Sequence, residues 1–408
     1  MTDVFLVASK GIPARYGGFE TFVERLVRGR TTDRIRYHVS CMAQKEDRNK
    51  TERFEYQGAD CFRVKVPLPG APGRILHVSM ALSQIAGWKK EHSDSDTVVY
   101  ILGCRIGPLM KYHAGILRKL GCRIYVNPDG LEWKRAKWNM AAKRFLHYCE
   151  GCLVKNADLV ICDAKAIERY IKKTYGSRVK RTVYLAYGAD IHADADDGQG
   201  YGEDSKKRRG QNGDPWNQWC KEKGIRAKEY YLIVGRFVPD NNYETVIKEF
   251  MKSDSTRDLA IVSNIEKNQF YEQLKKNTGF EQDPRIKFVG TVYDERLLSA
   301  IRKNAFAYLH GHEVGGTNPS LLEALAATDL NLVLDVEFGK EVAGDAALYW
   351  SKKDGDLQRL IGQAEKLGRE QILLLGKKAK ERIRRYYSWE KLVQDYERLF
   401  MEDRIDLQ

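Results

Sequence analysis

Several patterns that identify common protein classes are absent from this 408-residue sequence. No stretch approaches the roughly 18 apolar residues that a membrane-spanning helix requires, and the strand-like first residues do not resemble a signal peptide. Zinc-finger and RNP-type signatures and a long basic tail are also missing, which weakens the case for nucleic acid as a partner. We therefore expect a cytoplasmic protein that binds no nucleic acid.

Patterns that hold metals or disulfides are equally scarce. The eight cysteines are irregularly spaced, and Cys149 and Cys152 have no second pair that would complete a zinc site. Asp94 and Asp96 form an Asp-x-Asp pattern, but they precede an expected strand instead of following one. We expect reduced thiols, no cofactor and no metal requirement.

Length and charge indicate a two-domain protein with an anionic partner. A chain of 408 residues, 43% of them hydrophobic, is long enough for two α/β domains with separate cores. The net charge of +13 favours an anionic partner. Nucleic acid, an acidic membrane surface and phosphate-bearing substrates all fit this charge.

The first half of the chain is typical of a Rossmann-like unit. Residues 4–8 form an apolar run, a Gly-rich loop follows, and apolar residues then recur at helical spacing. The loop lacks the Gly-x-Gly-x-x-Gly fingerprint, so Gly17 and Gly18 either let a phosphate or sugar approach the backbone or only form a tight turn. Further strand-like runs, which predict a parallel, doubly wound sheet, lie at 37–41, 62–66, 97–102, 123–126 and 159–161.

Ligands of such sheets bind beyond the carboxyl ends of the strands. Two of the expected strand ends carry reactive or charged residues, at 103–105 and at 127–130. Asp129 is the stronger catalytic candidate, because a carboxylate there can accept the proton of an attacking hydroxyl. The alternative is an ordinary residue of a Pro-Asp-Gly turn.

Aromatic and basic residues are interleaved after this turn. The residues concerned are Trp133, Lys134, Arg135, Lys137 and Trp138. On helices, such a mixture suits a membrane interface or a lipid-linked anion. Inward-packed aromatics with a solvated basic face are an equally good interpretation, and a nucleic-acid surface is a weaker one.

A polar, Gly-rich stretch at 192–213 predicts a domain boundary, and a second series of strands and helices follows it. Its strand-like runs lie at 230–234, 259–262, 286–289, 305–309 and 331–334. Arg236 comes directly after the first of these runs, where a guanidinium can bind phosphate through paired donors.

The most informative pattern is a Gly-rich turn at 315–318 that leads into an expected helix. Asn318 suits the N-cap and Pro319 the first turn, so the free N–H groups of the turn can bind an anion. Glu323 either accepts hydrogen bonds from a nucleoside sugar or forms a purely structural capping box with Ser320.

Four motifs, in order along the chain, resemble those of the large retaining glycosyltransferase family 4. They are most similar to the bacterial rhamnosyltransferases that start polyrhamnose and capsule chains. The motifs are KGIPARYGGFETFVE from Lys10, VNPDGLEWKRAKW from Val126, VGRFVPDNNYE from Val234 and GGTNPSLLEAL from Gly315. This resemblance spans nearly the whole chain and implies an α/β GT-B architecture, with two Rossmann-like parallel-sheet domains facing a central cleft.

The resemblance also implies roles for individual residues. Gly17 and Gly18 border the donor phosphates, Arg236 binds the diphosphate, and Glu323 holds the nucleoside sugar. The turn residues that face the phosphates and the transferred sugar are Gly315, Gly316, Thr317 and Asn318.

Two departures from the broad family bear on the donor. Asn241, which we expect to contact the donor, stands where the family usually has a Lys. Gly315 stands where the family has a sugar-contacting Glu, with Glu313 two residues earlier. These changes disfavour the usual UDP- or GDP-hexoses and are consistent with dTDP-rhamnose, since a deoxy sugar offers fewer hydroxyls. The family's usual His base is not apparent, and Asp129 lies nearby in the pattern.

The expected function is transfer of L-rhamnose from dTDP-β-L-rhamnose to a polyprenyl-diphosphate-linked N-acetylglucosamine or glucose, with retention and a β-1,4 linkage. This reaction belongs to cell-wall or capsule polysaccharide synthesis at the inner face of the plasma membrane. The alternatives are a UDP-sugar-dependent glucosyl- or N-acetylglucosaminyltransferase and a non-catalytic nucleotide-sugar-binding scaffold. The expected division is an acceptor domain (1–190), a linker (191–227), a donor domain (228–387) and a final helix packed on the first domain (388–408).

Overall fold

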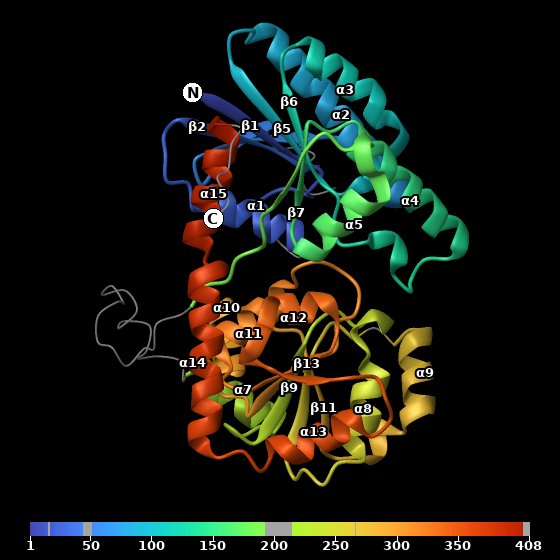
Figure 1. The fold of residues 1–408 in the computed structure, drawn as a ribbon, viewed down its shortest axis with the longest axis vertical. Coiled ribbons are helices and arrows are strands. Elements are labelled where there is room, and N and C mark those ends of the chain that lie inside the picture. Colours follow the sequence, from blue (N-terminus) through green and yellow to red (C-terminus); the bar gives the residue numbers. More distant parts are fainter. Residues whose placement is uncertain (15–16, 44–50, 192–213, 266, 403–408) are drawn as a thin grey trace. The chain divides into compact units, whose positions relative to one another are not determined.

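The computed structural model describes residues 1–14, 17–43, 51–191, 214–265 and 267–402. The polar, Gly-rich stretch at 192–213, which is part of the predicted linker (191–227), lies outside the described residues. The chain divides into two α/β units (Figure 1). The first unit comprises Met1–Tyr187, Val314–Thr317 and Trp389–Gln408, and the second comprises Gly188–Glu313 and Asn318–Ser388.

The first unit is built on an eight-stranded sheet in the order β3-β4-β2-β1-β5-β6-β7-β8. Its strands are β1 (Thr2–Val7), β2 (Ile35–Met42), β3 (Arg53–Tyr56), β4 (Ala59–Val64), β5 (Asp96–Leu102), β6 (Arg123–Asn127), β7 (Leu159–Cys162) and β8 (Thr182–Tyr184). The pairing is parallel except between β3 and β4. The loops that follow β1, β5, β6 and β7 therefore leave the sheet at one edge.

Helices cover both faces of this sheet, so β1 is buried along its whole length. They are α1 (Gly18–Arg28), α2 (Gly70–Glu91), α3 (Met110–Lys119), α4 (Met140–Lys155), α5 (Lys165–Tyr175) and α15 (Trp389–Glu402), with the short helices η2 (Cys104–Leu109), η3 (Glu132–Lys134) and η4 (Gly176–Arg178). Helix α15, from the end of the chain, packs beside α1, and α2 packs beside α3 (Figure 1).

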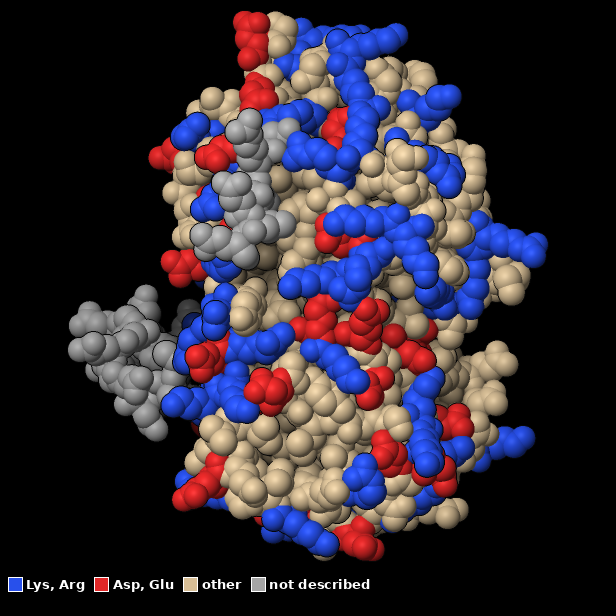
Figure 2. Space-filling view, viewed as in Figure 1, with Lys and Arg blue, Asp and Glu red and all other residues tan. Residues whose placement is uncertain are grey.

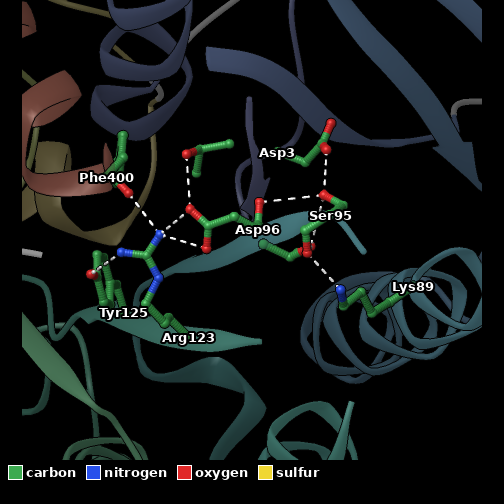
Figure 3. A network of polar contacts seen from close by, with 9 residues as sticks. Asp3, Lys89, Ser95, Asp96, Arg123, Tyr125 and Phe400 are labelled. Carbon is green, nitrogen blue, oxygen red and sulfur yellow. Dashed lines mark hydrogen bonds and ion pairs between the residues drawn. The ribbon is translucent and has the colours of Figure 1, made fainter. Parts of the chain in front are cut away.

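A polar network joins the amino ends of the central strands to α15 (Figure 3). The Arg123 guanidinium donates to Asp96 Oδ2 at 2.7 Å and to the carbonyl oxygen of Phe400 at 2.9 Å. On the other side, Lys89 Nζ donates to the carbonyl oxygen of Ser95 at 2.6 Å. This network lies at the opposite ends of the strands from the loops that are expected to bind ligands.

The second unit is built on a six-stranded sheet in the order β11-β10-β9-β12-β13-β14, and its pairing is parallel throughout. Its strands are β9 (Tyr230–Val234), β10 (Asp258–Val262), β11 (Ile286–Gly290), β12 (Ala307–His310), β13 (Asn331–Leu334) and β14 (Leu348–Trp350). Its helices are α7 (Pro215–Lys223), α8 (Tyr243–Met251), α9 (Gln269–Thr278), α10 (Glu295–Lys303), α11 (Pro319–Ala327), α12 (Glu337–Ala343), α13 (Asp356–Ala364) and α14 (Arg369–Tyr386), and its short helices are η5 (Pro239–Asn241), η6 (Phe280–Gln282) and η7 (Gly344–Ala346). Apolar clusters fill both faces of the sheet.

The predicted α/β architecture with two parallel sheets is confirmed, and every predicted strand run overlaps an observed strand. Strands β3, β8 and β14 were not predicted. All three are edge strands, and they are only 4, 3 and 3 residues long, respectively. An edge strand is covered less completely, so its sequence carries a weaker apolar signal. Within the described residues, no helix combines the length and hydrophobicity that crossing a bilayer requires.

Candidate functional site

The start of α11 lies at the carboxyl end of β9. Asn318 is the N-cap, and its Oδ1 accepts a hydrogen bond from the Ser320 backbone N–H at 2.9 Å, as predicted. The alternative capping box is wrong, because Ser320 is not the N-cap; its Oγ donates instead to the carbonyl oxygen of Val234 at 2.9 Å. This bond fixes the amino end of α11 beside the last residue of β9.

Arg236 follows β9 by two residues, and its side chain is exposed. The guanidinium makes no hydrogen bond or ion pair with any described residue. The surrounding loop is held by Asn241, whose Nδ2 donates to the Arg236 carbonyl oxygen at 2.6 Å and whose Oδ1 lies 2.8 Å from His312 Nδ1. The loop is therefore fixed while the Arg236 side chain can bind an anion. The Asn241 amide, named above as a donor contact, holds the loop.

The Glu323 carboxylate has an ion-pair partner that was not predicted from the sequence. Its carboxylate forms an ion pair with the guanidinium of Arg302, which is only 5% exposed on α10. The Glu323 side chain remains 43% exposed, so one side of the carboxylate can still meet a ligand. The residue thus has a structural duty in addition to the role that the resemblance implies.

The Gly-rich turn belongs with the first unit as far as Thr317. Thr317 Oγ1 donates to the backbone carbonyl oxygen of Asp163, and a Cβ atom at Gly316 would overlap the Asp163 carboxylate. The backbone N–H groups of 315–318 make no hydrogen bond to any described residue. They therefore provide the unused donors that an anion site at this turn requires.

Asp129 lies in the same unit, directly after β6. It adopts a left-handed conformation with φ of 66°, its N–H donates to Asn127 Oδ1, and its own Oδ1 accepts from the Gly130 N–H, both at 2.8 Å. A Cβ atom at Gly130 would overlap the backbone at Gly316, so the two turns lie against each other. Asp129 is thus a turn residue with one carboxylate oxygen engaged, and its second oxygen faces no described hydrogen-bond donor.

Asp163 is a buried acid beside the Gly-rich turn, and it was not among the site residues predicted from the sequence. It follows β7 immediately, as Asp129 nearly follows β6. The rule that ligands bind at carboxyl strand ends would have found Asp163, because β7 was predicted.

The loop after β1 is held by an acid of α1. Glu20 Oε1 accepts from the Lys10 backbone N–H at 2.8 Å, and a Cβ atom at Gly17 would overlap the Glu20 carboxylate. Gly17 has φ of 143°, which also favours glycine. Gly18, in contrast, has open space around its Cβ position. Packing therefore explains Gly17, while Gly18 leaves room for a ligand.

The sequence is similar to one protein family and to one curated protein. Residues 1–190 match the family described as "Domain of unknown function (DUF1972)". A protein of Methanocaldococcus jannaschii named an uncharacterized glycosyltransferase is 26% identical over 255 residues, which cover 61% of this chain and 59% of that protein. This chain therefore spans less than two thirds of the length of the curated relative.

Solved structures match over nearly the full length. An α,α-trehalose 6-phosphate synthase from Burkholderia multivorans has a TM-score of 0.72, with 11% identity over 100% of this chain and 99% of its own. An Anabaena protein solved with UDP has a TM-score of 0.67, with 13% identity over 97% and 98%. The chain has the GT-B fold.

In this GT-B chain, Glu313 does not replace the acid missing at Gly315. Its Oε1 accepts from Lys352 Nζ at 2.6 Å, and its Oε2 lies 3.3 Å from Asn242 Nδ2. Burial raises the pKa of Glu313, but the hydrogen bonds from Lys352 and Asn242 and the charge of Lys352 lower it overall. The carboxylate is therefore committed to neighbours within its own unit.

The basic-aromatic segment of the GT-B chain is partly neutralised by its own acid. Glu132 pairs with Arg135 at 2.6 Å and with Lys137 at 2.7 Å, and it accepts from Trp138 Nε1 at 3.1 Å. Lys134 lies over the Trp133 ring, 5.4 Å from its centroid. Two of the three cations predicted to face a membrane are therefore engaged within the segment.

Helices η2, α3 and α4 of the first unit expose large apolar side chains. Eleven described large apolar residues are classed as exposed, and five of them lie on η2, α3 and α4: Leu109, Tyr112, Met140, Phe145 and Tyr148. Helix η2 packs on α4, where Gly107 meets Cys149. Lys and Arg side chains crowd this region (Figure 2). These five exposed residues lie outside the segment at 133–138 that was predicted to meet a membrane.

The eight cysteines are free thiols, and among the described residues no group of His, Cys, Asp and Glu could hold a metal ion. Burial, followed by the nearby Cys152, raises the pKa of Cys149 to about 11. Cys149 is therefore a buried, unreactive thiol at neutral pH.

Proposed function

We propose that this GT-B protein is a glycosyltransferase that moves L-rhamnose from dTDP-β-L-rhamnose to a polyprenyl-diphosphate-linked sugar. The observation that carries the proposal is Arg236: an exposed guanidinium without a partner among the described residues, at the strand end where α11 begins. A guanidinium and a helix amino terminus at one strand end suit a nucleotide diphosphate. The relative's name and the UDP in the Anabaena structure support a nucleotide-sugar donor.

The proposed reaction is a displacement on one face of the sugar. The bond from the sugar's anomeric carbon to the diphosphate oxygen breaks, and a bond from the acceptor oxygen to that carbon forms on the same face. The acceptor hydroxyl proton passes to the leaving diphosphate, while Asp129 orients that hydroxyl. Arg236 stabilises the negative charge that develops on the leaving group.

The donor assignment rests on groups that are missing or committed. Gly315 supplies no carboxylate, Glu313 is paired with Lys352, and the Asn241 amide holds its own loop. A donor sugar with few hydroxyls leaves fewer hydrogen bonds unmade in such a site. This supports a deoxyhexose over glucose or N-acetylglucosamine, the sugars of the alternative donors.

The acceptor lipid implies work at an anionic membrane surface. The five exposed apolar residues on η2, α3 and α4 suit an interfacial docking face, because aromatic and basic groups mix there. We assign membrane contact to this face in addition to the residues at 133–138. The protein would then act at the cytoplasmic leaflet without crossing it.

The decisive test is transfer by purified protein to a lipid-diphosphate-linked N-acetylglucosamine, with dTDP-rhamnose, UDP-glucose and UDP-N-acetylglucosamine compared as donors. We expect turnover with dTDP-rhamnose at least about tenfold above either UDP-sugar, since one lost hydrogen bond to a charged group is worth about 1.5–3 kcal/mol. Turnover that prefers a UDP-sugar would overturn the donor assignment. Binding of dTDP without transfer to any acceptor would favour a non-catalytic scaffold.

A further inference from the structure

Two arginines and a histidine of the first unit lie together and have no hydrogen-bond or ion-pair partner in the part of the chain that the structure describes. Arg74 and His77 are one turn apart on α2, and Arg105 lies on η2, which packs against α2. The Nε atom of Arg74 and the Nε2 atom of His77 are buried without a hydrogen-bond partner. Arg105 is half-buried and makes no hydrogen bond or ion pair with any described residue.

The electrostatic environment of this cluster is unfavourable without a ligand. Burial and then the charge of Arg105 lower the pKa of Arg74, and the same two causes lower the pKa of His77 to about 4. Glu132 is the nearby acid that acts on Arg74, but its carboxylate already pairs with Arg135 and Lys137. Like charges in a partly buried site repel unless an anion offsets them.

The amino end of α2 adds to the same positive potential. The helix is 22 residues long, has no acid in its first turn and has no side-chain cap on Pro69. A Cβ atom at Gly73 would overlap the carbonyl oxygen of Leu68, so the preceding chain folds tightly over the first turn. His77 is only 2% exposed, so its imidazole lies beneath the surface of the unit and is not part of a flat charged face.

We propose that Arg74, His77 and Arg105 bind a phosphoryl group. Guanidinium groups bind phosphoryl oxygens through paired N–H donors, and two of them with an imidazole match the several oxygens of a diphosphate. If the proposed function holds, the ligand is the diphosphate of the acceptor lipid.

The position of the cluster fits that ligand. Arg105 follows β5, and this strand end is tied to the Asp129 turn: the Gly103 N–H donates to the carbonyl oxygen of Asn127 at 2.8 Å, and Cys104 Sγ donates to that of Pro128 at 2.9 Å. In a lipid-diphosphate sugar, the sugar ring separates the attacking hydroxyl from the diphosphate. A phosphoryl site one loop away from Asp129 has the arrangement that such an acceptor requires.

The test is calorimetric binding of inorganic pyrophosphate and of dTDP to the full chain, to an Arg74→Gln/Arg105→Gln variant and to an Arg28→Gln control. The Kd for pyrophosphate should rise at least about tenfold in the double variant, equivalent to about 1.4 kcal/mol, while the Kd for dTDP stays unchanged. The Arg28→Gln control should match the native chain in both measurements. Unchanged pyrophosphate binding in the double variant, or an equal loss of dTDP binding, would overturn the proposal.

A folding defect is separable from a lost site. Because the two guanidinium groups repel each other, the double variant should have a Tm at least as high as that of the native chain. Pyrophosphate should raise the Tm of the native chain and not that of the variant. A pyrophosphate-induced rise of equal size in both proteins counts against the site.

The source of the phosphoryl group is tested with two further ligands, a short-chain prenyl-diphosphate sugar and phosphatidylglycerol vesicles. The double variant should lose affinity for the prenyl-diphosphate sugar and keep its affinity for the vesicles. Loss of vesicle binding alone would make the cluster part of a membrane surface and overturn the assignment. Pyrophosphate binding without any sugar transfer would leave the site standing and refute the proposed function. Sugar transfer by the double variant with an unchanged acceptor KM would support the proposed function and refute the phosphoryl site.

Discussion

At the residue scale, the two side chains most closely linked to donor binding differ in what else they do. Arg236 is exposed and has no partner among the described residues, so its side chain contributes nothing visible to folding. Glu323 pairs with the buried Arg302, so it contributes to stability, and under the proposed function it also holds the nucleoside sugar. A substitution of Arg236 should therefore affect activity alone, whereas a substitution of Glu323 should affect stability as well.

Replacing Arg236 with Ala should lower kcat/KM for transfer at least about 100-fold, because the charge on the leaving diphosphate loses a paired donor. The Tm should not change. Steady-state kinetics and thermal unfolding check both statements, with the exposed Arg226→Ala as a matched control in the same unit. Full activity of the Arg236→Ala variant would refute its role.

Glu323→Gln should lower the free energy of unfolding by about 1–3 kcal/mol, because it leaves a buried guanidinium without its anion. If Glu323 also holds the nucleoside sugar, the Kd for dTDP should rise about tenfold. Arg302→Leu separates the two effects, since it removes the buried charge and keeps the carboxylate. A normal Kd for dTDP in Glu323→Gln would leave Glu323 with only its structural role.

At the scale of elements, helix α15 packs on the first unit although it is distant in sequence from the other elements of that unit. Phe400 packs its ring near Tyr100 and Tyr125, and its carbonyl oxygen accepts from Arg123 (Figure 3). At its other side, the Glu397 carboxylate accepts from the Thr31 backbone N–H at 2.8 Å. Aromatic packing and helix capping together hold the helix against the sheet.

Arg123→Met should lower the free energy of unfolding by about 1–3 kcal/mol, because the Phe400 carbonyl and Asp96 lose their shared donor. Urea unfolding measured by tryptophan fluorescence gives this quantity. Lys65→Met breaks the ion pair of Lys65 with Glu52, both exposed, and should leave the urea midpoint unchanged. Equal effects of the two substitutions would contradict a special role for the network.

His310, the last residue of β12, should make the stability of the protein depend on pH. Burial, followed by the nearby His312, lowers the pKa of His310 to about 3. The unfolded chain therefore binds the extra proton between pH 6.5 and 3, and stability falls as the pH drops through this window. Between pH 6.5 and 5, His310 should account for about 2 kcal/mol of that loss. Urea unfolding of His310→Leu at both pH values should show a correspondingly smaller loss, and an identical loss would show that His310 is not the source.

At the scale of the whole molecule, charge and exposed apolar area occur together on the first unit. The net charge is +13, and α3 carries Lys111, Arg118 and Lys119 without an acid. Helices α3 and α4 also expose large apolar side chains. Lys and Arg side chains gather over this part of the first unit (Figure 2). Such a surface combines apolar insertion with attraction to anionic lipid.

Phe145→Ser/Tyr148→Ser should reduce binding to phosphatidylglycerol vesicles at least about tenfold, because the two rings no longer enter the interface. Vesicle flotation measures this binding. A matched control, Tyr293→Ser/Leu373→Ser, removes two exposed apolar side chains of the second unit and should bind as the native chain does. Equal losses in both variants would show that no specific docking face exists.

The sequence was sufficient for the architecture and for the local geometry at strand and helix ends. Apolar runs predicted the buried strands, and Asn318 with Pro319 predicted the start of α11, because both signals depend on residues near each other in the chain. The same local reading placed Arg236 at the end of β9. Local rules decide such features because few residues take part in them.

Only the tertiary structure decided which charged groups remain available. Glu323 with Arg302, Glu313 with Lys352, and Arg123 with the carbonyl of Phe400 join residues that are distant in sequence or on different elements. The cluster on α2 and η2, which has no partner among the described residues, could not be predicted for the same reason, since a charge without a partner is recognised only from its neighbours in the fold. Sequence determined where the strand ends lie, and packing determined which of their side chains are left to bind a ligand.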